Sequence, residues 1–360
     1  MRVLQVCHRF PPHPGGIEYH VQRLAKYLSA NGHEVTVLTT SRDTESTGEE
    51  GGYTVIKLKY RFEPLRNPIP LKFPLKFREL SSSFDVIHMH SIYTFTTLSS
   101  FPFADKSRVV ITLHGRAYYR GMASLLAMLH ERLSFRMLKG ASAFISLTEL
   151  DRRLMMRRGI DGSKIKVIPN FVDLEEIDGI AKRCGAIDKD SEVQLLFVGS
   201  LVEAKNLESL LMDLRKLGGS VSLWVIGDGP LRAKLERLAG KNVKFLGRMR
   251  REDWIPYALS SDALVLPSKS EGFPTVVLEA MALRKPVIVS NIEVHKMLFG
   301  DVAIFYDPGN PKSLAKALEM LKDSDEKVKR GRRLIEELYD VKVVAKKIVE
   351  LYEEVMSSSP

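Results

Sequence analysis

The fold class is clearest in residues 261–290, which run Ser261-Asp-Ala-Leu-Val-Leu-Pro-Ser-Lys-Ser-Glu-Gly-Phe-Pro-Thr-Val-Val-Leu-Glu-Ala-Met-Ala-Leu-Arg-Lys-Pro-Val-Ile-Val-Ser290. A short apolar run at residues 263–266 ends at a proline and predicts a buried parallel strand. Residues 275–283 predict a helix, and residues 286–289 predict a second buried strand. This order is typical of open α/β folds, which bind ligands in the loops at the carboxyl ends of their strands.

Two carboxylates follow the first of these strands. Glu271 lies in the loop, while Glu279 is expected to face out from the second turn of the helix. The helix N-terminus should attract phosphate, because its first N–H groups have no partner within the helix. Pro274 has no N–H group, and Gly272 keeps the backbone accessible. The candidate amide donors are therefore Phe273, Thr275 and Val276.

This layout suits a sugar nucleotide. Glu271 would face the sugar hydroxyls, the amides would face the phosphates, and Glu279 would hold the ribose hydroxyls. An ordinary βαβ unit with two solvated glutamates explains the same pattern, so the residues alone leave both interpretations open.

The same stretch resembles a known family. The E-x7-E signature of family-4 glycosyltransferases, which are retaining enzymes with the two-domain GT-B fold, is similar to Ser270-Glu-Gly-Phe-Pro-Thr-Val-Val-Leu-Glu-Ala-Met-Ala282. Strands and helices also alternate in both halves, which predicts two doubly wound, Rossmann-like α/β domains facing a cleft. We expect an acceptor-binding domain at residues 1–175, a donor-binding domain at residues 176–340, and a helix at residues 341–360 that returns to the first domain.

The composition is ordinary. The chain has 360 residues, of which 44% are hydrophobic and 27% charged, enough to bury two cores. No apolar run approaches the length needed to cross a bilayer, and the N-terminus lacks a signal-peptide layout, so we expect a cytoplasmic protein. Cys7 and Cys184 offer neither metal-ligand spacing nor a disulfide framework.

Positive charge is concentrated in the first half. Residues 1–170 hold 25 Lys and Arg against 14 Asp and Glu, whereas the remainder hold 29 against 30, which gives the net charge of +10. This asymmetry favours an anionic membrane surface or a lipid-linked phosphate as a partner, with the protein peripheral on the inner face of the membrane. Nucleic acid is not favoured, because no zinc finger, aromatic ribonucleoprotein motif or basic zipper is present.

Residues 60–80 strengthen the expectation of a membrane, since they interleave aromatic and aliphatic residues with Lys and Arg. Their four prolines disfavour a continuous helix. The alternative is a proline-stiffened connection that packs its apolar residues on the domain. Strands are predicted on either side of a polar loop before this segment, at residues 34–40 and 53–59.

A glycine pair separates the first predicted strand, residues 3–7, from a helix at residues 17–30. Glycine before a helix N-terminus lets a phosphate approach closely, and this loop resembles the glycine loop that family members use near the donor diphosphate and the acceptor. Gly16 is therefore a candidate donor contact. A tight structural turn is the alternative, since the dinucleotide pattern G-x-G-x-x-G is absent.

Two further strands carry histidines. His88 and His90 lie on one face of the strand at residues 85–91, and we interpret them as polar groups lining the cleft, because no cysteine or carboxylate cluster completes a metal site. The strand at residues 109–115 ends in Thr-Leu-His-Gly, which resembles the family motif whose histidine contacts the transferred sugar. The resemblance assigns that role to His114.

The segment between the domains is placed at residues 170–190 and includes Asp188-Lys-Asp190. This is superficially the D-x-D of metal-dependent glycosyltransferases with the other major fold, whose carboxylates follow a strand beside the nucleotide. Here they precede a strand, so we interpret them as solvated.

The second domain begins with a strand, a glycine turn and a helix entry at residues 192–207. This resembles the family's phosphate-binding segment, which usually offers an arginine after the glycine and a lysine a turn later. Lys205 fits the lysine, whereas Ser200 stands where the arginine is usual. Lys269 is a candidate substitute for the missing cation.

The resemblance and the residues together predict a retaining, metal-independent hexosyltransferase that moves a sugar from a nucleoside diphosphate sugar to a hydroxyl acceptor, lipid-linked or glycan. Lys205 and the amides after Gly272 would stabilise the leaving diphosphate, while Glu271 would stabilise positive charge at the sugar ring. No metal or other cofactor is expected. Two rivals remain open: a sugar-nucleotide epimerase of the same fold, and a non-enzymatic basic module that binds lipid or nucleic acid.

Overall fold

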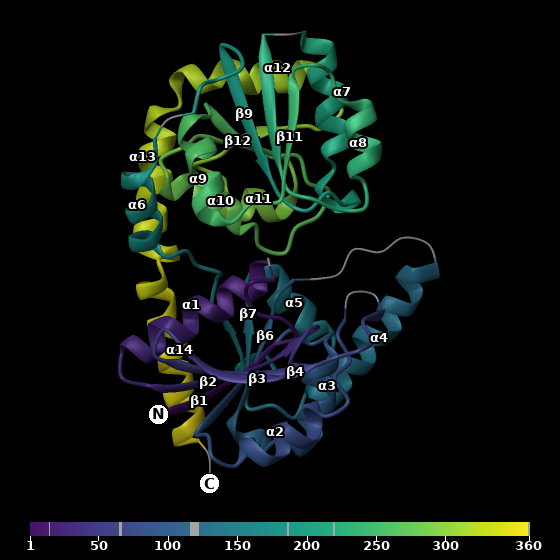
Figure 1. The fold of residues 1–360 in the computed structure, drawn as a ribbon, viewed down its shortest axis with the longest axis vertical. Coiled ribbons are helices and arrows are strands. Elements are labelled where there is room, and N and C mark those ends of the chain that lie inside the picture. The colour runs from purple at the N-terminus through teal and green to yellow at the C-terminus, as the bar shows by residue number, and fades with distance from the viewer. Residues whose placement is uncertain (14, 65–66, 116–121, 186, 219, 359–360) are drawn as a thin grey trace. The chain divides into compact units, whose positions relative to one another are not determined.

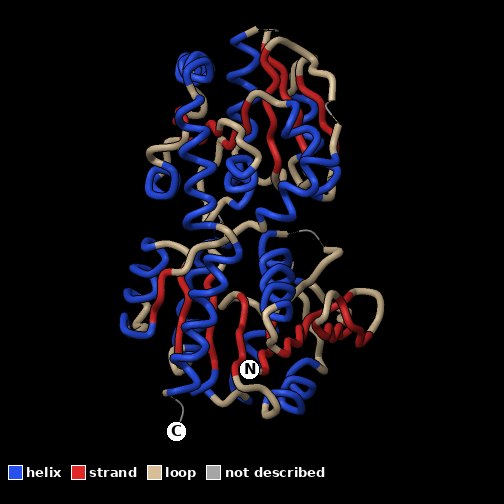
Figure 2. The backbone as a smooth tube through the Cα atoms, turned by 90° about the vertical axis from the view of Figure 1, so that its left-hand side faces the viewer, coloured by secondary structure: helices blue, strands red, loops and turns tan. Residues whose placement is uncertain are grey.

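The computed structural model describes residues 1–360 except 14, 65–66, 116–121, 186, 219 and 359–360 (Figure 1). The chain forms two compact units, Met1–Phe171 with Val341–Pro360 (unit 1) and Val172–Asp340 (unit 2). The units therefore divide a few residues before the boundary expected between 175 and 176. Helices flank the strands of each unit (Figure 2), as the expected doubly wound α/β class requires.

Unit 1 contains an eight-stranded sheet in the order β3-β4-β2-β1-β5-β6-β7-β8, parallel except for β3. The strands are β1 (Arg2–Val6), β2 (Glu34–Ser41), β3 (Ser46–Glu50), β4 (Tyr53–Lys59), β5 (Val86–His90), β6 (Val109–Leu113), β7 (Ala143–Ser146) and β8 (Ile165–Val167).

Strand β3 corrects the polar loop expected between residues 40 and 53. It is mostly exposed and has no apolar pattern, but it pairs antiparallel with β4 through the two-residue turn Gly51-Gly52. Both glycines have positive φ, 59° and 89°, which is the backbone that a tight hairpin turn needs. The glycine pair was therefore the sequence signal for this hairpin.

The helices of unit 1 bury apolar faces on both sides of its sheet. They are α1 (Gly16–Ala30), α2 (Phe73–Ser81), α3 (Phe95–Ser100), α4 (Met122–Leu138), α5 (Glu149–Arg157) and α14 (Val341–Ser357). Helix α14 packs against α1 and places Tyr352 in the core. No helix in the described part of the chain is long and apolar enough to cross a membrane.

Helix α2 refines the interpretation of residues 60–80, of which 65–66 lie outside the described residues. A helix begins at Phe73 with Pro74 in its first turn, where the missing N–H group costs no helical hydrogen bond. Phe73 and Phe77 are fully buried, whereas Leu71 and Leu75 are exposed. The segment thus packs part of its apolar surface on the unit and leaves part outside.

Unit 2 contains a six-stranded parallel sheet in the order β11-β10-β9-β12-β13-β14. The strands are β9 (Val193–Val198), β10 (Val221–Ile226), β11 (Val243–Gly247), β12 (Ala263–Leu266), β13 (Val287–Ser290) and β14 (Ile304–Tyr306). The helices are α6 (Leu174–Arg183), α7 (Leu207–Leu217), α8 (Arg232–Leu238), α9 (Arg251–Ser260), α10 (Thr275–Ala282), α11 (Glu293–Phe299), α12 (Pro311–Glu319) and α13 (Asp325–Leu334).

The expected linker at residues 170–190 contains a helix, because α6 occupies its centre. Asp173 caps this helix by accepting a hydrogen bond from the N–H of Glu176 at 2.9 Å. The helix buries Leu174, Ile177 and Ile180, so it belongs to the packed body of unit 2.

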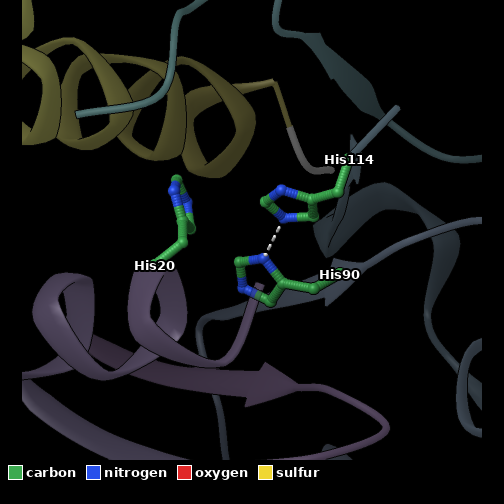
Figure 3. Close-up of side chains that lie close together, drawn as sticks. All are labelled: His20, His90 and His114. Atoms are coloured by element: carbon green, nitrogen blue, oxygen red, sulfur yellow. Dashed lines mark hydrogen bonds between the residues drawn. The ribbon is translucent and has the colours of Figure 1, made fainter. Parts of the chain in front are cut away.

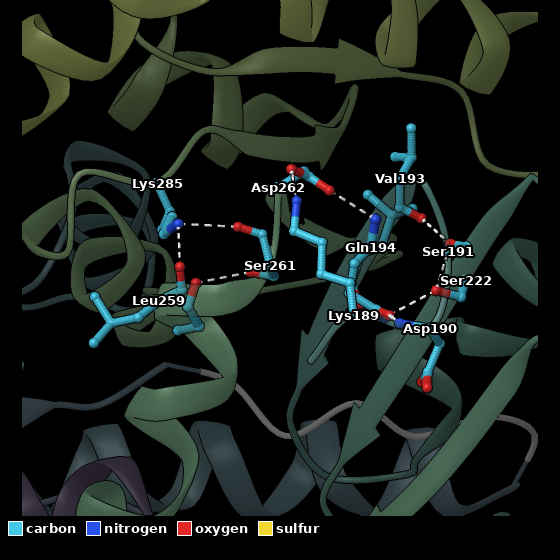
Figure 4. Close-up of polar contacts among 12 residues, drawn as sticks. Lys189, Asp190, Ser191, Val193, Gln194, Ser222, Leu259, Ser261, Asp262 and Lys285 are labelled. Carbon is cyan, nitrogen blue, oxygen red and sulfur yellow. Dashed lines mark hydrogen bonds and ion pairs between the residues drawn. The ribbon is translucent and has the colours of Figure 1, made fainter. Parts of the chain in front are cut away.

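The expectation that Asp188-Lys-Asp190 is solvated is incomplete, because two of its three side chains bind other residues of unit 2. Asp190 accepts a hydrogen bond from Nε1 of Trp224 at 2.7 Å and pairs with Lys244. Lys189 lies 2.6 Å from Asp262, the residue before β12, whose carboxylate also accepts from the N–H of Gln194 at 2.8 Å (Figure 4). These contacts join β9, β10 and β12, so the segment has a structural role.

Candidate active site

The strand order of unit 2 creates a switch point between β9 and β12. Successive strands run outward from β9 on one side, through β10 and β11, and from β12 on the other, through β13 and β14. At such a point the loops at the carboxyl ends diverge and leave a crevice in which α/β folds bind ligands. Lys205 follows β9 and Glu271 follows β12, so the strand order brings these two predicted residues together.

Lys205 and Glu271 form an ion pair at this point. The Nζ atom of Lys205 lies 2.6 Å from Oε1 of Glu271, and the two side chains are 21% and 8% exposed. Ser268 donates a second hydrogen bond from Oγ to the same carboxylate oxygen at 2.5 Å. The carboxylate is therefore held at one oxygen by two donors from different loops.

The two loops are also joined through their backbones. Asn206 adopts a left-handed conformation with φ of 53°, and its Nδ2 donates to the carbonyl of Pro267 at 3.1 Å. The N–H of Lys269 donates to the carbonyl of Ala204 at 2.8 Å. These bonds fix the positions of Lys205 and Glu271 before any ligand binds, which is the condition for preorganised electrostatics.

A close backbone approach lies beside this pair. Gly227, with φ of 140°, follows β10, and a Cβ atom added there would lie 1.9 Å from the carbonyl oxygen of Gly199. Only glycine fits this position. Ser200 directly follows Gly199 in the sequence and is exposed. The side chain of Lys269, the predicted substitute cation, is exposed as well.

The N-terminus of α10 has the expected amide layout. Pro274 occupies the N-cap position. No hydrogen bond between described residues uses the backbone N–H groups of Phe273, Thr275 or Val276. Gly272, Thr275 and Val276 are partly exposed, whereas Phe273 is buried against Tyr339. This helix start can therefore accept an anion without losing a bond to protein.

The expectation that Glu279 faces solvent is wrong. It is buried, with 8% exposed, and it pairs with the guanidinium of Arg251 from α9. Arg251 also reaches Glu176 of α6 at 3.0 Å. Helix α10 buries residues on most of its circumference, so an outward position does not exist at its second turn. Arg251 is thus a charged partner that the sequence did not identify.

His295 is a second residue missed from the sequence. It is fully buried in α11, and its Nδ1–H donates to the carbonyl of Ser290 at 2.9 Å. Its Nε2 atom is buried without a hydrogen-bond partner among the described residues. Burial lowers the pKa of His295, against the opposing charge of Glu271, so the ring is neutral. A single histidine in a short helix carries no sequence signal.

Three histidines meet at the ends of β5 and β6 in unit 1. Nδ1 of His90 lies 2.9 Å from Nε2 of His114, and His20 of α1 approaches both rings (Figure 3). One nitrogen from each lies within 4.8 Å of the others, so these residues could hold a metal ion. The sequence interpretation named cysteines and carboxylates as the missing ligands, whereas the structure places two further histidines, His20 and His114, beside His90. In this structure the facing nitrogens of His90 and His114 bind each other.

The histidines belong to a hydrogen-bonded chain through the core of unit 1. Nε2 of His90 bonds Oε1 of Gln5, whose Nε2 donates to the hydroxyl of Tyr352 at 3.2 Å. That hydroxyl lies 2.6 Å from Nδ1 of His88, and Nε2 of His88 lies 2.7 Å from the hydroxyl of Thr112. Both His88 and His90 are fully buried, so the expectation that they line an open cleft is wrong.

The hydrogen-bonded chain determines which ring nitrogen of His90 and of His114 carries the proton. Because Oε1 of Gln5 only accepts, His90 carries its proton on Nε2 and accepts at Nδ1. His114 must then donate from Nε2, which leaves its Nδ1 as an acceptor. Burial lowers the pKa of His90 and His114 well below the usual range, so both rings are neutral. Burial also lowers the pKa of His20 to about 4.

Gly16 begins α1 at the other switch point, between β1 and β5 of unit 1. A Cβ atom added at Gly16 would meet nothing within 4 Å. At Gly15 it would lie 2.1 Å from the Glu18 carboxylate. Packing therefore does not explain a glycine at Gly16, and its contact with a donor stays a prediction.

The family model described as Glycosyltransferase Family 4 matches residues 14–176, and the model described as Glycosyl transferases group 1 matches residues 185–338. An uncharacterized glycosyltransferase from Methanocaldococcus jannaschii is 27% identical over 98% of both chains. The phosphatidyl-myo-inositol mannosyltransferase of Mycobacterium leprae is 26% identical over 99% of this chain and 98% of its own length.

Solved structures share the fold. Sucrose-phosphate synthase from Thermosynechococcus elongatus has a TM-score of 0.78 and 19% identity, covering 99% of this chain and 100% of its own. HepE from Anabaena, in complex with UDP and glucose, has a TM-score of 0.74 and 16% identity, covering 98% and 100%. Two matching family models along most of the chain, two parallel-sheet Rossmann-like units and these relatives show that the chain belongs to the family-4 glycosyltransferases with the GT-B fold.

Proposed function

We propose that this glycosyltransferase transfers a sugar from a nucleoside diphosphate sugar to a hydroxyl acceptor with retention of anomeric configuration and without a metal ion. The observation that carries the proposal is the ion pair of Lys205 and Glu271 at the switch point of unit 2, in the loop that leads into α10. The first amides of that helix have no hydrogen-bond partner among the described residues. A cation and free N–H groups suit a diphosphate, and a carboxylate beside them suits sugar hydroxyls.

The transfer reaction requires charged groups of the protein close to the atoms on which charge develops in the transition state. When the bond between the sugar and the diphosphate breaks, negative charge grows on the phosphate and positive charge on the ring. Lys205 and the amides of Phe273, Thr275 and Val276 would stabilise the first. Glu271 would stabilise the second, and its contact with Lys205 keeps both groups oriented before the donor binds.

Glu279 is proposed to hold the ribose. Its carboxylate pairs with the guanidinium of Arg251, which restricts its rotation. Ser200 contributes no positive charge, so the diphosphate would depend on Lys205, with Lys269 able to assist if its exposed side chain turns inward.

His114 is proposed to contact the transferred sugar. Its neutral Nδ1 atom can accept a hydrogen bond from a sugar hydroxyl, because its Nε2–H is already directed to His90. The leaving phosphate would accept the proton of the acceptor hydroxyl on the same face.

A lipid-linked hydroxyl is the acceptor class that we favour. The positive charge of residues 1–170 supports it, and one relative at 26% identity is named for transfer to phosphatidyl-myo-inositol. A peripheral position on the inner face of a membrane follows from such an acceptor.

The test begins with thermal shifts across UDP-, GDP- and ADP-sugars. The donor so identified is then incubated with hydroxyl acceptors, with and without a chelator. We expect release of nucleoside diphosphate that needs an acceptor, survives chelation and gives a product with the anomeric configuration of the donor by proton NMR. Conversion of the donor alone into an epimer and nucleotide would replace the proposal with an epimerase. Inverted product or chelator-sensitive turnover would reject the retaining or metal-independent part.

A further inference from the structure

Helix α4 of unit 1 has two contrasting faces. Phe135 and Leu138 are fully buried, and Glu131 and Ser134 on the same face are buried too. The opposite face exposes four leucines, at 55–65% of their surface, together with Met137 at 39%. These leucines are Leu125, Leu126, Leu129 and Leu133.

The exposed leucines form a continuous ridge. Leu125, Leu129 and Leu133 recur at four-residue intervals, so they lie one above another along the helix. Single exposed leucines are common on protein surfaces, but a row of them along one helix face marks a surface that another apolar body covers. Figure 1 places α4 at the periphery of unit 1.

Positive charge accompanies the ridge. Arg132 and Arg136 are exposed, and each lies three positions after a leucine of the ridge. Within the described residues, neither arginine has an ion-pair partner. The acid of this helix, Glu131, lies on the packed face, where it binds Arg158 at 2.6 Å and Tyr93 at 3.2 Å. The outward face is therefore apolar and basic.

The apolar and basic character of this face favours a lipid surface over a second copy of the chain as its partner. Two copies of the α4 face would bring arginines together without an acid to neutralise them, which opposes association. An anionic bilayer satisfies both components, because leucines insert between the acyl chains while arginines reach the phosphates.

We propose that the α4 ridge, formed by Leu125, Leu126, Leu129, Leu133 and Met137 with Arg132 and Arg136, docks unit 1 on an anionic phospholipid bilayer. This proposal does not depend on the transfer reaction, since its test measures binding alone.

The segment before and within α2 is the matched control. Phe62, Leu71 and Leu75 are also exposed, at 64%, 74% and 67%. Two of the three cations at residues 72–78 lie in ion pairs, however, because Lys72 pairs with Glu45 at 3.3 Å and Lys76 with Glu79 at 2.7 Å. Replacing three apolar residues in either region removes a similar apolar area, so the comparison isolates the place of contact.

The experiment measures co-sedimentation with vesicles of phosphatidylcholine alone or mixed with phosphatidylglycerol. Replacing Leu126, Leu129 and Leu133 jointly by Gln should weaken binding to anionic vesicles at least about a hundredfold. Replacing Arg132 and Arg136 by Gln should weaken it about fivefold for each arginine and flatten its salt dependence. The control variant with Gln at Phe62, Leu71 and Leu75 should bind like wild type.

A direct readout comes from Leu129→Trp, whose emission should shift to the blue on anionic vesicles, while Leu75→Trp should not shift. Circular dichroism checks that every variant is folded. Equal binding to neutral vesicles, undiminished binding by the α4 leucine variant, or loss with the α2 control would overturn the proposal. Wild-type self-association that the α4 leucine replacement abolishes, without vesicle binding, would assign the ridge to a second copy instead.

Discussion

The two switch points of the molecule differ in the charge of their polar groups. In unit 2 the residues proposed to bind the sugar donor lie in ion pairs, Lys205 with Glu271, and Glu279 with its partner Arg251. In unit 1 the polar groups are imidazoles that burial keeps neutral, joined in one hydrogen-bonded chain from Thr112 to His114. The difference matches what each unit is proposed to contact: a diphosphate needs fixed positive charge, whereas a sugar hydroxyl needs a neutral acceptor of fixed orientation.

The largest effect should come from removing the cation of unit 2. Lys205→Ala should lower kcat/KM about a hundredfold or more, because a preorganised charge on the leaving group is lost. Lys269→Ala is the comparison and should have an intermediate effect, since its exposed side chain assists only if it turns inward. Steady-state kinetics with the identified donor measures both. A folded Lys205→Ala enzyme with near-normal kcat/KM would remove the basis for the charged site.

A large effect in unit 1 should appear in stability. Tyr352→Phe deletes the hydroxyl that links Gln5 to His88 and leaves two buried polar atoms without a partner. The free energy of unfolding should fall by about 1–3 kcal/mol, as chemical denaturation would measure. Tyr27→Phe, on the partly exposed face of α1, is a control that should have little effect. An unchanged stability in Tyr352→Phe would mean that the chain through the core is not formed.

A smaller effect is expected at the ribose carboxylate. Glu279→Gln keeps an acceptor for Arg251 but removes the charge, so donor KM should rise about tenfold with a lesser fall in kcat. Glu176→Gln also alters the surroundings of Arg251 and should leave KM unchanged, because Glu176 is assigned no contact with donor. If kcat falls as much as kcat/KM while KM stays constant, Glu279 acts in the transition state and not on ribose.

The last effect, which is small over any one pH unit, should appear on acidification. Burial lowers the pKa of His8 and of His20 to about 4, from an ordinary value near 6.5. The unfolded chain therefore takes up protons first, so stability present above pH 6.5 should be lost as pH falls toward 4. Each such histidine contributes about 1.4 kcal/mol per pH unit in this window. Denaturation across pH, with His20→Gln as the comparison, measures it; a flat profile would show that the rings are not buried as neutral groups.

Features of the fold and of the candidate site could be predicted from the sequence where they depend on residues close together in the chain. Strands such as β12 and β13 were predicted, because a short apolar run identifies a strand buried on both faces. Lys205 and Glu271 were named because each lies in a local motif. Their contact required the strand order that places β9 beside β12, and that order is set by packing of the whole sheet.

The other features could not be predicted from the sequence, because they depend on contacts between distant residues or on the packing of whole elements. Tyr352 meets His88 across 264 positions, a contact that no local pattern encodes. The outward position expected for Glu279 failed because α10 is enclosed by neighbouring helices. Strand β3 was missed because it is held by a hairpin turn and not by an apolar face.

In the proposed mechanism a diphosphate binds at the switch point of unit 2, between Lys205 and the start of α10. Isothermal titration of the nucleoside diphosphate and the nucleoside monophosphate of the preferred base, against wild type and Lys205→Ala, tests it most directly. Lys205→Ala should weaken binding of the diphosphate about tenfold or more and leave the affinity for the monophosphate within about twofold, since a charge-assisted bond to the terminal phosphate is lost. Equal weakening of both ligands, or of neither, would contradict it.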